Sequence, residues 1–230
     1  LVKANTGGDI LLRVAVVSGP EIKGQDDRNF TITTASRVAV GKIEGVEGKN
    51  FETQADQIVT KVTSKLNVES EGRFYNDEQL PVGMGALPPQ VGQTTTYQLI
   101  WSLTNPTNEV TQVVVSATLP DNVIWTGTQA VTAGQAVAFD AVTREITWRV
   151  NRVPPGTGSL FPSLEATFKV SITPVTTDLG QLMLLLNRTV VTARDEFTAK
   201  DIRLEKAIVT TDLTTDVAAQ GKGLVVAAQP

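Results

Sequence analysis

The chain has 230 residues, of which 41% are hydrophobic and 19% are charged, and its formal net charge at pH 7 is −4. This is the composition of a folded protein, and without a concentration of Lys and Arg it lacks the electrostatic signature of nucleic-acid binding. It contains no Cys and no His, which removes thiolate nucleophiles, the usual zinc ligands and the side chain best suited to proton transfer near neutral pH. We therefore predict a protein that is not an enzyme, with no catalytic and no cofactor-binding residues, that does not bind nucleic acid.

The chain also lacks the sequence features of membrane insertion. No stretch approaches the roughly 18 apolar residues that span a bilayer, so no membrane contact is expected within this segment. Leu1 opens the sequence with neither an initiator Met nor a signal-peptide pattern. This indicates a piece of a longer polypeptide, whose export signal or anchor would lie elsewhere.

Strand signals dominate from the N-terminus onward, with abundant Thr and Val and with turn residues between short runs. Residues 52–64 are a candidate helix, because Ile58 and Val62 lie one helical turn apart. Val and Thr crowd that stretch, however, and β-branched residues favour strand. The clearest strand covers residues 94–104, where apolar and polar positions alternate as in a half-buried strand. Its expected buried face consists of Thr95, Tyr97, Leu99, Trp101 and Leu103.

Further strands follow in chain order, each ended by turn residues. They are expected at residues 113–119, 123–125, 136–139, 146–150 and 166–172, with a hairpin from residue 190 onward and a last run at residues 207–211. Residues 182–186 are continuously apolar, and form either a strand buried on both faces or one that crosses an interface. Many short strands with closely spaced turns predict an all-β protein of the immunoglobulin-like β-sandwich class.

Two patches of sequence recur weakly at a spacing of about 150 residues. Residues 9–17 resemble residues 165–173, and residues 51–60 resemble residues 197–210. The recurrence predicts immunoglobulin-like modules in tandem. A first module that lacks its early strands would need upstream chain or a partner to bury its core.

The repeat divides the chain into three parts. Residues 1–61 would be the C-terminal part of one module, or an incomplete module, and residues 62–213 a complete β-sandwich module. Residues 214–230 would be a linker or the first strand of a following module.

Residues 87–174 resemble a repeat of bacterial surface and cell-wall proteins, the family called domain of unknown function eleven. The residues that carry the likeness are Val91, Gly92, Gln93, Thr96 and Tyr97; Asn105; Val115 to Thr118 with Leu119 and Pro120; Ile146, Thr147 and Trp148; Pro155 and Gly156; and Phe168, Val170 and Ile172. The chain departs from the family pattern at Ala117, where an acidic residue is common, and at Asn105-Pro106, where Asn-Thr-Gly is usual. The resemblance implies an immunoglobulin-like sandwich in a secreted, repetitive, surface-attached protein without known catalytic activity.

Acidic clusters are the first place to look for calcium, which takes oxygen ligands from loops. Asp195, Glu196 and Asp201 are the calcium candidates, although no cluster has the ordered spacing of a known calcium loop. A solvated surface is the commoner role for such residues. No other metal or cofactor is expected.

Two further functions have candidate residues in the sequence, sugar stacking and glycoside hydrolysis, and each candidate also has a plain structural role. Trp125 is the candidate exposed aromatic for stacking on a sugar, whereas Trp101 and Trp148 fall in phase with the apolar face and are expected in the core. Glu145 or Glu165 near Trp148 is the best carboxylate pairing for glycoside hydrolysis, but a sandwich loop or strand edge is the commoner place for these residues.

The sequence thus leaves two functions open. One is a structural module of a bacterial cell-surface or extracellular filament or stalk protein, which assembles with other copies of itself or with neighbouring modules through end-to-end or strand-exchange contacts. The alternative is an adhesin module that recognises a cell-wall glycan, a host glycan or a protein through loops at one end of the sandwich. Both place the protein outside the cell, at its surface.

Overall fold

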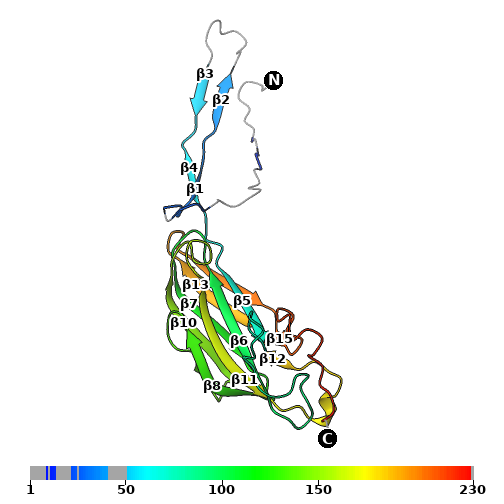
Figure 1. Cartoon of the computed structure of the whole chain (residues 1–230). Coiled ribbons are helices and arrows are strands. Elements are labelled where there is room, and N and C mark those ends of the chain that lie inside the picture. Colours follow the sequence, from blue (N-terminus) through cyan, green and yellow to red (C-terminus); the bar gives the residue numbers. More distant parts are fainter. Residues whose placement is uncertain (1–8, 10, 14–21, 25, 41–50, 229–230) are drawn as a thin grey trace.

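The computed structural model describes residues 9, 11–13, 22–24, 26–40 and 51–228. Within these residues the ordered elements are β-strands, apart from one short 3-10 helix, η1 (Thr176–Asp178). None of the described residues belongs to a helix long and apolar enough to cross a membrane. Figure 1 shows a twisted β-sandwich with a narrow two-stranded ribbon extending from one end. The all-β prediction is confirmed.

The sandwich consists of two antiparallel sheets. Among the described residues one sheet has the strand order β5-β6-β11-β8 and the other the order β14-β13-β7-β10-β9. The bounds are β5 (Asn67–Arg73), β6 (Thr95–Thr104), β7 (Val110–Thr118), β8 (Val123–Val131), β9 (Ala138–Phe139), β10 (Glu145–Val153), β11 (Leu164–Ile172), β13 (Thr189–Asp195) and β14 (Lys200–Lys206).

This arrangement is that of an immunoglobulin-like sandwich. The first sheet matches the A-B-E-D order of that fold, and β14, β13 and β7 match G, F and C with extra strands beside C. After β7 the chain forms β8 in the first sheet and only then returns to the second sheet, where it adds β10 beside β7. In the usual immunoglobulin order the strands beside C come before strand D, so the order here is reversed. The immunoglobulin-like prediction is confirmed.

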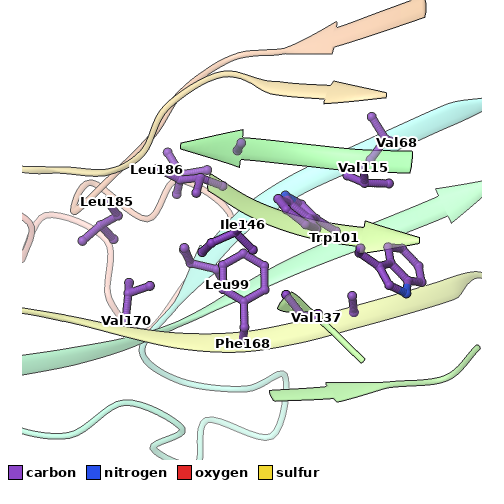
Figure 2. Close-up of a cluster of buried hydrophobic side chains, with 14 of the residues drawn as sticks. Val68, Leu99, Trp101, Val115, Val137, Ile146, Phe168, Val170, Leu185 and Leu186 are labelled. Atoms are coloured by element: carbon purple, nitrogen blue, oxygen red, sulfur yellow. The ribbon is translucent and has the colours of Figure 1, made fainter. Parts of the chain in front are cut away.

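The core lies between the inward faces of the two sheets, where apolar residues alternate along each strand. β6 is buried at every second residue, as predicted for residues 95–103; β7 follows the same rule from Val113 onward, and β11 from Ala166 to Val170. Trp101 and Trp148 are fully buried, and Figure 2 shows Trp101, Phe168 and Ile146 packed together between the sheets. The rings of Trp101 and Phe168 meet edge to face with centroids 4.9 Å apart, a favoured aromatic geometry.

The apolar run at residues 182–186 covers one open end of the core. β12 (Leu184–Leu186) pairs with β15 (Val209–Thr210) in a separate two-stranded sheet. Met183, Leu185 and Leu186 are buried while Leu182 is half exposed. The run is therefore a strand with most of its side chains inside one module.

The ribbon is made of two successive strand pairs. β1 (Thr31–Thr34) pairs with β4 (Ile58–Lys61), and β2 (Arg37–Val40) pairs with β3 (Phe51–Gln54). The stretch weighed as a helix is therefore strand, as its β-branched residues favoured. The prediction that residues 1–61 are part of another module stays a prediction, since much of residues 9–17 and the range 41–50 lie outside the described residues.

The C-terminal segment differs from the linker or following strand that the sequence suggested. Residues 211–226, here called the C-terminal strap, pack along the module itself, with Asp216, Ala219 and Val225 buried. Two isolated bridges join the strap to the module, between Leu182 and Leu224 and between Gln90 and Val226. The module thus continues beyond residue 213, because the small residues of the strap allow close backbone approach.

Candidate functional site

The most concentrated set of buried polar contacts surrounds Asp195, at the pole of the sandwich where the ribbon leaves it. Asp195 Oδ2 accepts hydrogen bonds from the backbone N–H of Ser64 at 2.7 Å and from Asn108 Nδ2 at 2.8 Å. Its Oδ1 accepts from the backbone N–H of Thr198 at 2.8 Å. Burial raises the pKa of Asp195, but these hydrogen bonds together outweigh it and hold the pKa below its ordinary value of 3.8. The residue is an internal carboxylate anchor.

Asn105 forms the second half of this network. Its Nδ2 donates to the carbonyl oxygens of Asn108 at 2.7 Å and Val153 at 2.9 Å. Its Oδ1 accepts from Ser64 Oγ at 2.6 Å. Asn105 thereby ties together the β6–β7 turn, the end of β10 and the segment that enters β5.

The ribbon is fixed to the same pole by contacts at its base. The backbone N–H of Asn29 donates to Asn108 Oδ1 at 3.2 Å, and Asn108 Nδ2 donates to the carbonyl of Val62 at 2.7 Å. Lys61 Nζ donates to the carbonyl of Phe197 at 2.9 Å and lies 4.6 Å from the centre of its ring, a cation–π contact. Both strands at the foot of the ribbon are therefore bound to the sandwich.

The structure separates the three calcium candidates. Asp195 faces inward and uses its oxygens on protein donors, while Asp201 is exposed and pairs with Arg194 at 2.9 Å. Glu196 accepts from the hydroxyl of Thr111. Within the described ranges no group of three or more Asp, Glu, His or Cys side chains is placed to hold a metal ion.

The aromatic candidate Trp125 is half-buried and packs toward the core. Its ring stacks on Phe139 with centroids 5.8 Å apart and an interplanar angle of 22°. It also contacts Phe168 at 5.7 Å. Trp125 therefore closes the gap between β8 and β9, and most of its apolar surface is committed to packing.

The carboxylates weighed for glycoside hydrolysis lie on different sheets. Glu145 begins β10, whereas Glu165 lies on β11. Glu165 accepts from Ser163 Oγ at 3.0 Å, and Trp148 is buried between the sheets and donates its indole N–H to the carbonyl of Ala133 at 3.0 Å. The arrangement brings no acid and base together around the indole.

A second buried carboxylate, Asp216, holds the C-terminal strap. Its Oδ2 accepts from the backbone N–H groups of Phe74 and Tyr75, each at 2.7 Å. At the start of the strap, Thr211 Oγ donates to the carbonyl of Gly223 at 2.7 Å and accepts from the backbone N–H of Met183 at 2.9 Å. The two poles of the module are thus each secured by buried polar contacts.

The sequence alone does not identify Asp195 or Asp216 as a buried anchor. The cluster of Asp195 with Glu196 and Asp201 resembles a solvated surface, although Asp195 falls in phase with Thr189, Val191 and Ala193 on the buried face of β13. That alternation was the available signal. Asp216 has no comparable signal, because the strap that carries it has no strand periodicity.

The fold and its anchors define an immunoglobulin-like β-sandwich whose polar interior groups serve structure. No family model and no curated protein matches the sequence, so the resemblance to domain of unknown function eleven rests on the quoted residues, while the sandwich that it implies is confirmed.

The solved structures to which the chain is similar include proteins of different kinds. The full-length major pilin SpaD of Corynebacterium diphtheriae is 12% identical, with a TM-score of 0.38 over 70% of this chain and 44% of that one. The C-terminal domain of the Streptococcus pyogenes antigen I/II-family protein AspA is 12% identical, with a TM-score of 0.37 over 81% and 56%. The Fcho1 Mu homology domain of Danio rerio is 11% identical, with a TM-score of 0.33 over 80% and 59%. The chain spans less than two thirds of each, and the likenesses do not select a function.

Proposed function

We propose that the chain is a structural module of a bacterial cell-surface or extracellular filament or stalk protein. The observation that carries the proposal is the Asp195 network, because it makes the ribbon and the sandwich one continuous body. The ribbon strand β4 leads through Ser64 directly into β5, and Ser64 is held by Asp195 and Asn105. Such a connection suits a protein whose role is to transmit force or hold a shape.

The direction of the strands supports the same role. The ribbon leaves one pole of the sandwich and the C-terminal strap ends at the other (Figure 1). A pull between these poles acts along β5, which is paired with β6 from Asn67↔Thr104 to Arg73↔Gln98. Antiparallel ladder bonds lie across the strand direction, so they resist such a pull together rather than one at a time.

In this role the partners are other copies of the chain or neighbouring modules, joined end to end or by exchange of strands. The adhesin alternative places recognition of a glycan or a protein in loops at one end of the sandwich, with Trp125 as its candidate aromatic residue. Because Trp125 stacks on Phe139, no observation on the described residues favours that alternative over the structural role.

Immunogold electron microscopy on intact cells of the encoding organism tests the proposal. Antibodies against the chain are expected to label cell-surface or released filaments without permeabilisation, and antibodies against a cytoplasmic protein serve as the control. Labelling that requires permeabilised cells would contradict a surface role.

A further inference from the structure

The two sides of the sandwich differ in charge. On one side, the edge strand β14 has the sequence KDIRLEK over 7 residues, so that most of its side chains are charged. On the other side, residues 123–139, which contain β8 and β9, have no charged side chain. Natural proteins place charges, Lys above all, on edge strands to prevent pairing with other chains. The side formed by β8 and β9, here called the neutral edge, lacks this protection.

On the charged side the edge strands of the two sheets are also held together by a direct contact. Lys206 Nζ on β14 reaches Glu69 Oε1 on β5 at 2.9 Å and joins the two sheets. At the neutral edge residues 132–137 carry the chain from β8 to β9, and the sheets are also joined by the Trp125–Phe139 stack and by the Val137 N–H, which donates to Gln129 Oε1 at 3.3 Å. Among the described residues β8 pairs with β11 alone, at residues 123–125 and 129–131 on either side of an irregularity in the register, and β9 pairs with β10 alone. The outer side of each strand therefore has no strand partner.

The ribbon, for its part, would be stabilised by a further strand. A two-stranded ribbon is marginally stable in water, and three or more strands are required for independent stability. The β1–β4 pair exposes apolar side chains to solvent, and Lys61 is its only charged residue. The large exposed apolar residues of the described ribbon are Ile32, Val38, Ile58 and Val59. Pairing with a further strand would cover them.

The ribbon of one molecule cannot pair with the neutral edge of the same molecule. The ribbon points away from the sandwich, whereas β8 lies toward the opposite end (Figure 1). We propose that the neutral edge is an interface for a second copy of this chain, which adds a strand of its β1–β4 ribbon to β8. The inference rests on the proposed structural function and names the contact by which that function assembles.

Because the two surfaces differ, the pair of copies still presents one free ribbon, on one copy, and one free edge, on the other. A heterologous contact of this kind extends into an open chain of subunits rather than closing as a symmetric dimer. Backbone hydrogen bonds supply affinity in strand addition, and alternate side chains supply register.

Sedimentation velocity of the whole chain at rising concentration tests this contact. The wild type is expected to form species that grow beyond a dimer. Ala130→Lys charges the neutral edge and Val59→Lys charges the ribbon, both at exposed positions, and each variant alone is expected to stay monomeric. Thr215→Lys, at an exposed position on the strap, is the matched control and is expected to assemble like the wild type.

A mixture of the two defective variants gives the sharpest outcome. The edge variant keeps an intact ribbon and the ribbon variant an intact edge, so equal amounts are expected to form a one-to-one dimer that grows no further. A wild type that stays monomeric at every concentration, a closed wild-type dimer, or a mixture that stays monomeric would each overturn the proposed contact.

Circular dichroism and thermal unfolding check that each variant is folded. If Ala130→Lys does not fold, Ile124→Lys replaces it, because Ile124 lies on the same strand and is 61% exposed. Failure of self-assembly leaves the surface-labelling result intact, whereas labelling inside the cell with normal assembly would remove the proposed function and keep the contact.

Discussion

Ser64 and Asp195 are 131 positions apart in the chain, and the backbone N–H of Ser64 donates to the Asp195 carboxylate at 2.7 Å. The contact joins the segment that follows the ribbon to the end of β13. All three hydrogen-bond partners of the Asp195 carboxylate are N–H donors: two backbone N–H groups and the Asn108 amide. An isosteric amide at this position would turn an N–H group toward one of those donors.

Asp195→Asn is therefore expected to lower the free energy of unfolding by about 1–3 kcal/mol, the usual cost of leaving buried polar groups unpaired. Urea denaturation followed by Trp fluorescence measures the change. Asp201→Asn is the control, since its exposed ion pair with Arg194 is worth at most about 1 kcal/mol. Equal stability of the two variants would show that the Asp195 network contributes nothing.

The same carboxylate makes stability depend on pH in the acid range. Its pKa in the folded protein lies below the ordinary value of 3.8, so the unfolded chain binds the proton more readily. The stabilising contribution is present above pH 3.8 and is lost as the pH falls through the lowered pKa. The difference in unfolding free energy between wild type and Asp195→Asn should be constant near neutral pH and shrink on acidification. A difference that is unchanged at low pH would contradict this assignment.

Asp216→Ala is expected to release the C-terminal strap, because the N–H groups of Phe74 and Tyr75 lose their acceptor. We expect a loss of about 1–3 kcal/mol in unfolding free energy, and faster proteolytic cleavage within residues 211–226. Limited proteolysis with mass spectrometry locates the cuts. Asp212→Ala, four residues away on the same segment, is the control. If both variants are cut at the wild-type rate, Asp216 does not hold the strap.

Tyr97→Phe is expected to raise stability by about 1 kcal/mol, because it removes a buried polar atom at no cost in ring packing. The Tyr97 hydroxyl is buried and has no hydrogen-bond partner among the described residues. Burial raises the pKa of Tyr97 above its ordinary value of 10.0. Tyr97→Leu, which also loses the edge-to-face contact with Phe74 at 6.0 Å, should be destabilising. A Phe variant less stable than the wild type would imply a partner for the hydroxyl.

Trp125→Ala is expected to destabilise the module by about 1–3 kcal/mol through lost contacts with Phe139 and Phe168. Trp125→Phe should recover part of this loss, because a ring remains in the gap. Thermal unfolding measures both, and a glycan array run on the same variants separates packing from recognition. An Ala variant with wild-type stability and lost glycan binding would revive the adhesin alternative.

The strands of the sandwich were predictable where their alternation is strong. β6 carries large apolar residues at every second position from Tyr97, and β7 from Val113 and β11 from Ala166 carry apolar residues at the same spacing, so one face of each was visible in the sequence. β5 was not recognised, because the inward face of NVESEGR consists of Val68, Ser70 and Gly72 and so has one large apolar residue. Gly72 lets side chains approach the strand closely, since a Cβ at that position would lie 2.9 Å from Leu213 Cδ2 and 3.0 Å from Val209 Cγ1.

The polar anchors could not be predicted from local patterns in the sequence. Ser64, Asn105, Asp195 and Asp216 act through partners far away in the chain, and an isolated Asp or Asn reads as a surface residue. The strap was likewise hidden, because it is held by close approach: a Cβ on Gly223 would lie 2.4 Å from the Thr211 carbonyl oxygen. Small residues that permit such contact resemble a linker when only composition is considered.

The uneven placement of charge on the two sides of the sandwich bears on the environments in which the proposed assembly would persist. Contacts between exposed charges weaken as dissolved ions screen them, over about 8–10 Å at physiological ionic strength. A joint made by the neutral edge and the Thr-rich ribbon involves little charge, so its strength should vary little between fresh water, brine and host fluids. The Lys206–Glu69 side, by contrast, would respond to each change of medium.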